Sequence, residues 1–149
     1  MRKQLFKLFG DLPEKTDIQA TTLKIEEKDS FILETLLLEL NGIEPVPAYF
    51  AKPKQTKGKI PAVLYCHSHG GRYERGKKEL IEGAEYLEAP PFAAELASLG
   101  FASLAIDHWA FGDRRGKTES EIFKEMLWTG RVMWGMMVYD SIRALDYLE

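Results

Sequence analysis

The stretch IPAVLYCHSHGG at residues 60–71 carries the most informative pattern in this chain. Its first six residues, Ile60 to Tyr65, are apolar on both faces, which is typical of a parallel strand covered by helices. The two glycines at its end permit positive φ angles and a close approach of the backbone to a ligand. Free N–H groups in such a turn can hold the negative oxygen of a tetrahedral intermediate. We therefore predict a buried strand and, after it, an oxyanion-binding turn formed by His67, Ser68, His69, Gly70 and Gly71.

A second apolar segment, Phe101 to Ile106, predicts another buried strand, and it leads into a loop rich in glycine and arginine. A right-handed crossover would make the two strands parallel neighbours, with ligand sites beyond their carboxyl ends. We interpret the loop as structural. The Asp107 carboxylate would accept hydrogen bonds from loop amides, and Asp113 or Arg114 would hold the loop against a neighbouring segment. The residues assigned to it are Asp107, Gly112, Asp113 and Arg114. The alternative is a direct contact of Arg114 or Arg115 with an anionic substrate.

The segments around these two strands predict the rest of the architecture. Before residue 60, three predicted strands follow one another closely, and we expect them to pair in antiparallel fashion. Pro45 and Pro47 favour an edge position for the third of these strands. We predict an α/β fold of three layers with a mixed sheet, antiparallel in its N-terminal strands and parallel in the later ones. The expected single domain, 1–149, divides into an N-terminal helix and arm (1–18), antiparallel strands (19–59) and a strand–helix–strand–helix unit (60–149). The predicted strands are 21–27, 31–40, 46–51, 60–65 and 101–106, and the predicted helices are 1–10, 91–99, 119–129 and 132–148.

The last predicted helix, 132–148, carries more apolar residues than one buried face requires. Val138, Ile142 and Leu145 recur at helical spacing, so we predict that they face the core. Leu148 continues the same spacing. The role of Trp128, Trp134 and Met137 stays open between core packing and the wall of a pocket or contact surface.

The composition excludes several classes of partner. The 149 residues are 45% hydrophobic and 29% charged, and the net charge of −3 gives no reason to expect nucleic acid or an anionic membrane. No apolar run is long enough to span a bilayer. Cys66 is the only cysteine and cannot form an internal disulfide, so we predict a reducing compartment, the cytoplasm.

Two other interpretations of the histidine turn stay open. Ser68 would be a nucleophile if the turn were an elbow, but no helix start follows the turn, and the only histidine beyond it, His108, lies directly beside Asp107. A metal-dependent hydrolase is the second interpretation, because His67, His69 and His108 are expected near the ends of neighbouring strands. Further ligands of a common zinc motif are missing from the sequence, so we predict neither a metal nor a cofactor.

Several stretches resemble the α/β-hydrolase superfamily, in particular its branch of dienelactone hydrolases and acetyl xylan esterases. They are PAVLYCHSHGG (61–71), GFASLAID (100–107), FGDR (111–114), and a last segment with Gly135, VYD (138–140) and RALDYL (143–148). The resemblance implies hydrolysis of a small ester substrate. It also implies that residues 67–71 match the family's oxyanion loop and that Asp107 and residues 112–114 match its structural loop.

The resemblance covers only the N-terminal half of such a hydrolase domain. No Gly-x-Ser-x-Gly turn follows residue 71, so the serine, acid and base of a triad have no counterpart, and we expect this truncated chain to be inactive alone. Strand 60–65 would then be a bare apolar edge, which promotes association unless it is covered. We expect this edge and the C-terminal helix to form a homo-oligomer or to pair with a complementing chain. The alternative is a non-catalytic assembly or binding protein with a residual half-hydrolase fold.

Overall fold

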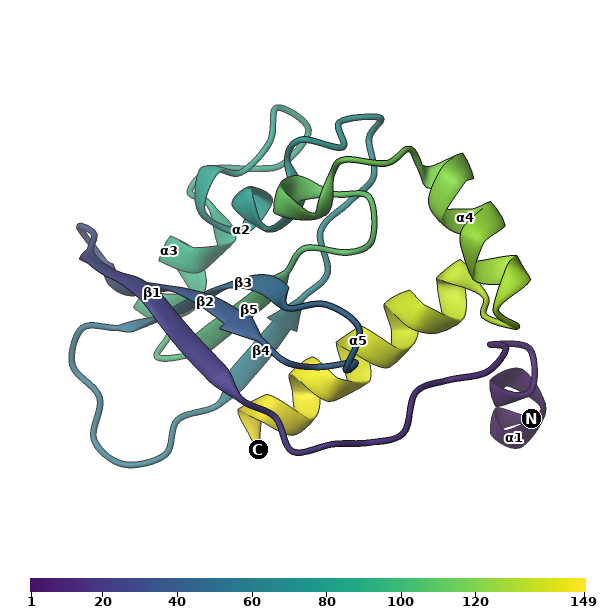
Figure 1. The fold of residues 1–149 in the computed structure, drawn as a ribbon. Coiled ribbons are helices and arrows are strands. Elements are labelled where there is room, and N and C mark those ends of the chain that lie inside the picture. Colours follow the sequence, from purple (N-terminus) through teal and green to yellow (C-terminus); the bar gives the residue numbers. More distant parts are fainter.

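Five strands form one mixed sheet in the computed structural model, which describes residues 1–149 (Figure 1). The strands are β1 (Ala20–Glu27), β2 (Phe31–Leu38), β3 (Val46–Pro53), β4 (Ala62–Tyr65) and β5 (Ala102–Ile106). Their order in the sheet is β1-β2-β3-β5-β4, with antiparallel pairing from β1 to β5 and parallel pairing between β5 and β4. The predicted fold class, α/β with antiparallel N-terminal strands and a parallel later pair, is confirmed.

Helices cover both faces of the sheet and complete three layers (Figure 1). They are α1 (Arg2–Phe6), α2 (Glu79–Glu82), α3 (Phe92–Ser98), α4 (Glu119–Trp128) and α5 (Met133–Leu148), with short 3₁₀ turns η1 (Gly76–Lys78) and η2 (Gly112–Arg114). On one face α5 packs through Ala144 against Leu104 of β5. On the other face α2 and α3 pack through Leu80 and Ala97 against Ala105. Because it is covered on both sides, β5 is buried along its whole length.

The third strand is not an edge, so that prediction was wrong. β3 lies between β2 and β5, and Pro47 stands where the ladder with β5 begins, since the first paired residue is Ala48. The Pro47 carbonyl oxygen accepts the Asp107 amide at 2.9 Å. Proline fits here because its missing N–H lies at the end of the ladder, where no donor is required.

The two edges of the sheet are β1 and β4. β1 is exposed over nearly its whole length, and its apolar residues Leu23 and Ile25 are more than half exposed. β4 is half-buried from Val63 to Tyr65 and has no strand on its outer side. The predicted apolar edge is therefore present, but its side chains are only partly covered.

The buried face of α5 is not the one that its spacing predicted. Met136 and Ala144 are buried, whereas Val138 and Ile142 are half-buried and Leu145 is 47% exposed. The prediction that the latter three residues face the core is wrong. Apolar side chains occur around most of the helix, so their spacing could not decide which stripe packs on the sheet.

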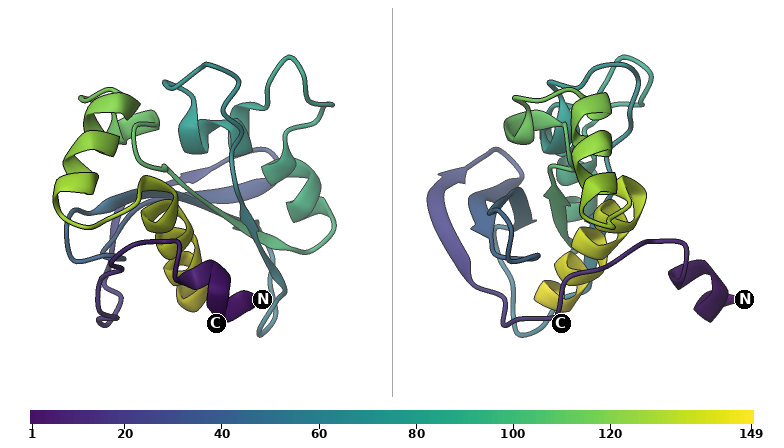
Figure 2. Two further views of the ribbon diagram at one scale, coloured as in Figure 1. Left: turned by 90° about the vertical axis from the view of Figure 1, so that its right-hand side faces the viewer. Right: turned by 45° about the vertical axis from the view of Figure 1, so that its right-hand side comes forward.

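The N-terminal arm runs past α5, and α1 projects from the rest of the molecule (Figure 2). α1 contains no buried residue. The arm passes close to α5 at Gly135, where an added Cβ would overlap the Phe9 carbonyl oxygen. Glycine is required there by the close approach of two backbones. No helix in the structure combines the length and the apolar content that a membrane crossing would need.

Candidate functional site

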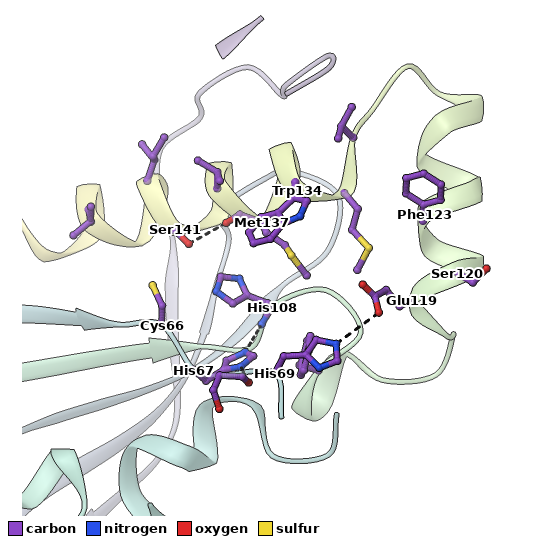
Figure 3. Close-up of a pocket in the computed structure, with 17 residues that line it drawn as sticks. Cys66, His67, His69, His108, Glu119, Ser120, Phe123, Trp134, Met137 and Ser141 are labelled. Atoms are coloured by element: carbon purple, nitrogen blue, oxygen red, sulfur yellow. Dashed lines mark hydrogen bonds and ion pairs between the residues drawn. The ribbon is translucent and has the colours of Figure 1, made fainter. Parts of the chain in front are cut away.

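A groove of about 850 Å³ opens at the carboxyl ends of β4 and β5, where ligand sites of parallel strands are expected (Figure 3). The histidine turn after β4 and His108 after β5 form one side of it. α5 and the start of α4 form the other side. Ten of its 17 lining residues are hydrophobic, so the groove suits an apolar group. The aromatic and sulfur-containing side chains on the helical side are Phe123, Met133, Trp134 and Met137.

Ser68 is held from behind by a buried glutamate. Glu79, the first residue of α2, is 2% exposed and accepts the Ser68 amide at 2.9 Å and the Ser68 hydroxyl at 2.6 Å. The same carboxylate accepts the hydroxyls of Tyr65 at 2.7 Å and Tyr86 at 2.5 Å. Burial acts to raise the pKa of Glu79, but these hydrogen bonds outweigh it and lower the pKa to about 2. None of the hydrogen bonds of the Ser68 hydroxyl involves a histidine.

The turn after Ser68 leaves two backbone amides without an acceptor in the protein. Gly71 donates its N–H to His69 Nδ1 at 3.1 Å, and Arg72 donates to the His69 carbonyl oxygen at 3.1 Å. The N–H groups of His69 and Gly70 have no partner among the hydrogen bonds of this turn. Gly70 and Gly71 have φ angles of +49° and +71°, which glycine adopts without strain. The two unpartnered amides are therefore available to an oxygen atom of a ligand.

His67 and His108 meet beside the groove, with ring centroids 5.0 Å apart (Figure 3). The His108 amide donates to His67 Nε2 at 3.3 Å, and His67 Nδ1 lies 3.0 Å from the Ser68 carbonyl oxygen. These contacts fit a His67 ring with its proton on Nδ1 and its lone pair on Nε2. Burial, together with His67 and Arg114, lowers the pKa of His108 to about 4, so the His108 ring is uncharged at neutral pH.

The three histidines do not converge into one metal site. His69 is directed to Glu119, with 3.8 Å between its Nε2 and the carboxylate, and its ring packs on Tyr73 and Phe111. No group of three or more His, Cys, Asp or Glu side chains has an arrangement that could hold a metal ion. The geometry gives no support to the metal-dependent interpretation with His67, His69 and His108.

Asp107 is fully buried and organises the loop after β5. Its carboxylate accepts the amides of Lys77 at 2.7 Å and Asp113 at 2.9 Å, and it also accepts Lys77 Nζ at 2.6 Å. Lys77 is 1% exposed and contacts the Asp113 carboxylate at 2.6 Å. Gly76 and Gly112, both with positive φ, lie against the Asp107 carboxylate, and a Cβ at either position would clash with it. The structure thus brings Asp107, Gly112 and Asp113 together around a buried lysine.

Arg114 connects this loop to α5 and does not line the groove. Its guanidinium contacts Asp140 at 2.9 Å and Glu44 at 2.7 Å, and it stacks over the Trp109 ring at 4.0 Å. An anionic substrate would have to compete with both carboxylates. Arg115 does not line the groove either, so neither arginine is placed to bind a ligand there.

The sequence did not reveal three residues that hold the site, namely Lys77, Glu79 and Tyr86. They lie in the polar segment 72–88, which contains none of the predicted strands and helices. Lys77 is buried while its neighbour Lys78 is half-exposed, and no local pattern separates the two. The apolar pair Leu80–Ile81 is the one signal that part of this segment packs on the sheet.

The sequence is similar to that of a curated protein of twice its length, although no protein-family model matches the chain. "Putative hydrolase YtaP" from Bacillus subtilis (strain 168) is 68% identical to it over 148 residues. The match covers 99% of this chain and 50% of YtaP. The chain therefore spans about half the length of this relative.

Two solved structures share the fold. A "putative acetyl xylan esterase" from Bacteroides fragilis NCTC 9343 matches with a TM-score of 0.72 at 15% identity, over 98% of this chain and 42% of that chain. An acetyl xylan esterase from Paenibacillus sp. R4 matches with a TM-score of 0.59 at 19% identity, over 98% of this chain and 43% of that chain. At these identities the likeness establishes the fold alone, which is hydrolase-like over the matched length.

Proposed function

We propose that this chain forms one part of an ester hydrolase that cleaves small carboxylic esters, and that it contributes the oxyanion-binding turn and one wall of the substrate groove. The observation that carries the proposal is the pair of unpartnered amides, on the groove-lining His69 and on the next residue, Gly70, at the carboxyl ends of two parallel strands. The sequence match to YtaP and the fold shared with two acetyl xylan esterases support it.

The amides act on the charge that develops during ester cleavage. When a hydroxyl attacks the ester carbonyl carbon, the carbonyl oxygen becomes negative, and loss of one preorganised N–H donor costs roughly 10²–10³ in rate. In this proposal the His69 and Gly70 amides donate to that oxygen, while Trp134 and Met137 keep water from the bound ester. Ser68 does not attack, because the carboxylate that accepts its proton has a pKa of about 2 and is too weak a base.

The attacking hydroxyl in this proposal comes from polypeptide that covers β4 and α5. β4 has an unpaired edge, and the groove face of α5 leaves Trp134 73% exposed. An open strand edge beside an apolar stripe is a surface that proteins normally cover. We propose that its occupant corresponds to the half of YtaP that this chain does not match, whether joined to this chain or separate from it. Pairing between two copies of this chain is the alternative outcome.

Complementation tests the proposal. This chain is produced alone and together with the unmatched part of YtaP, and hydrolysis of p-nitrophenyl acetate is measured for both preparations. We expect a stable complex and hydrolysis only by that complex, undiminished by a chelator. A fluorophosphonate probe followed by mass spectrometry should label a serine of the complementing part. A label on Ser68 would instead identify the turn as an elbow, and a stable complex with neither hydrolysis nor label would overturn the proposal.

A further inference from the structure

Glu79 stands directly behind the histidine turn, and the reaction proposed above does not use it. We propose that Glu79 is a positioning residue that sets the turn so that the His69 and Gly70 amides, and not the Ser68 amide, face the carbonyl oxygen of the substrate. This inference rests on the proposed ester-hydrolase function and adds a residue to it.

The Glu79 carboxylate joins three segments that meet at the turn. Tyr65 is the last residue of β4, Ser68 belongs to the turn, and Tyr86 follows α2. Oε1 accepts the Tyr65 hydroxyl and the Ser68 amide, and Oε2 accepts the hydroxyls of Ser68 and Tyr86. With two donors on each oxygen, the carboxylate cannot rotate without breaking at least one of these bonds.

Tyr86 extends the influence of Glu79 to the glycine at the other end of the turn. A Cβ added to Gly70 would lie 3.4 Å from the Tyr86 hydroxyl, so this side of Gly70 faces the tyrosine. The Ser68 hydroxyl also contacts the Tyr86 hydroxyl. Glu79 therefore holds Ser68 directly and holds Tyr86 in the position that faces Gly70.

Glu79 removes the Ser68 amide from the set of free donors. Within residues 68–71, Ser68 gives its N–H to the carboxylate and Gly71 gives its N–H to His69 Nδ1, so the His69 and Gly70 amides are left. Because hydrogen bonds lower the pKa of Glu79 to about 2, the carboxylate is ionised at neutral pH, and each bond to it is charge-assisted. The same low pKa makes Glu79 a poor proton acceptor, which argues against a role as general base.

The test compares Glu79→Gln with Glu82→Gln in the complex with the unmatched part of YtaP. Glu82 is an exposed residue of the same helix and serves as the matched control. We expect Glu79→Gln to lower kcat roughly 10- to 100-fold with KM changed by less than about threefold, because displaced donors weaken transition-state binding alone. Glu82→Gln should keep the kcat of the unmodified complex. Rates are counted per active site by exhaustive fluorophosphonate labelling, so a loss of folded protein cannot imitate the effect.

Two further measurements keep the inference testable if Glu79→Gln folds poorly or the complex is inactive. Tyr86→Phe removes one donor only, and we expect kcat to fall about three- to tenfold. In the isotopically labelled chain, the amide resonances of Ser68 and Gly70 should shift in Glu79→Gln and stay in place in Glu82→Gln. Unchanged kcat in a folded Glu79→Gln complex, or unchanged amide resonances, would overturn the inference. If the unmodified complex hydrolyses no ester, the proposed function is refuted instead. The amide resonances then decide whether Glu79 sets the conformation of the turn.

Discussion

The two faces of α5 both carry apolar side chains and differ in what covers them. On the inner face, Met136 is completely buried, and Asp140 and Arg143 are buried with partners from distant segments. On the groove face, Trp134 is 73% exposed and Leu145 is 47% exposed. The inner face is thus packed by the chain itself, whereas the groove face has no cover from residues 1–149.

This difference separates residues that stabilise the fold from residues that are available for function. Burying apolar surface contributes roughly 25 cal/mol per Å², so the inner face contributes to folding and the groove face contributes little. Folded monomers seldom leave a contiguous apolar stripe open unless it binds something. Substitutions on the inner face should therefore change the free energy of unfolding, and substitutions on the groove face should change binding.

The largest effect is expected at Asp140 on the inner face. Asp140→Ala removes the buried carboxylate that pairs with the Arg114 guanidinium and accepts the Asn41 side-chain amide, so we expect the free energy of unfolding to fall by about 3–5 kcal/mol. Lys15→Ala removes an exposed pair with Asp146 at 2.9 Å, leaves the contact of Asp146 with Arg143 in place, and should cost under about 1 kcal/mol. Urea unfolding of both variants measures the difference. Equal losses in the two variants would contradict the assignment of the inner face.

Two adjacent methionines provide the next comparison. Met136→Ala creates a cavity at a fully buried site and should lower the free energy of unfolding by about 3 kcal/mol. Met137→Ala trims a half-buried side chain that lines the groove, so we expect a loss below about 1 kcal/mol. Guanidinium unfolding with matched m-values checks both. A larger loss for Met137→Ala than for Met136→Ala would mean that Met137, and not Met136, lies on the buried face of α5.

These methionines also show why the sequence predicted α5 but not its orientation. Spacing revealed a helix at residues 132–148, yet Val138 and Ile142 form as regular a stripe as Met136 and Ala144 do. The inner face contains Asp140 and Arg143, which count as polar in any periodicity. Their burial depends on Arg114, Asn41 and the N-terminal arm, and contacts over such separations leave no local signal.

The sequence predicted the two turns that follow β4 and β5, but not all of the residues that hold those turns in place. The apolar runs that became β4 and β5 fixed the parallel pair, and the parallel pair placed His67 and His108 together. Glu79 and Lys77 could not be predicted, because a charged residue in a polar segment gives no sign that it is buried. The position of β3 was also beyond local reasoning, since a proline at the start of a ladder does not show whether another strand follows.

The protonation of His108 tests the groove side of the same comparison. Burial, His67 and Arg114 lower the pKa of His108 to about 4, against 6.5 for an ordinary histidine. As the pH falls, His108 is therefore protonated in the unfolded chain before it is protonated in the folded one. Stability should therefore decrease as the pH falls from about 6.5 to about 4, by about 2 kcal/mol for a partly exposed ring. In His108→Asn this contribution disappears, and the difference between the two proteins across that window isolates it. Parallel pH profiles of urea midpoints would contradict the burial of the His108 ring.

The smallest effect on folding is expected at Leu145, on the groove face. Leu145→Lys changes a side chain that is 47% exposed, so we expect the free energy of unfolding to change by less than about 0.5 kcal/mol. The same substitution places a charge under any polypeptide that covers α5, and it should weaken the complex with the unmatched part of YtaP at least about tenfold. Leu99→Lys, at a leucine that is 62% exposed and lies outside the groove, is the matched control and should affect neither quantity. A loss of stability above about 1 kcal/mol in Leu145→Lys would mean that the groove face belongs to the core of this chain, whereas unchanged stability with weakened binding is what an uncovered functional face requires.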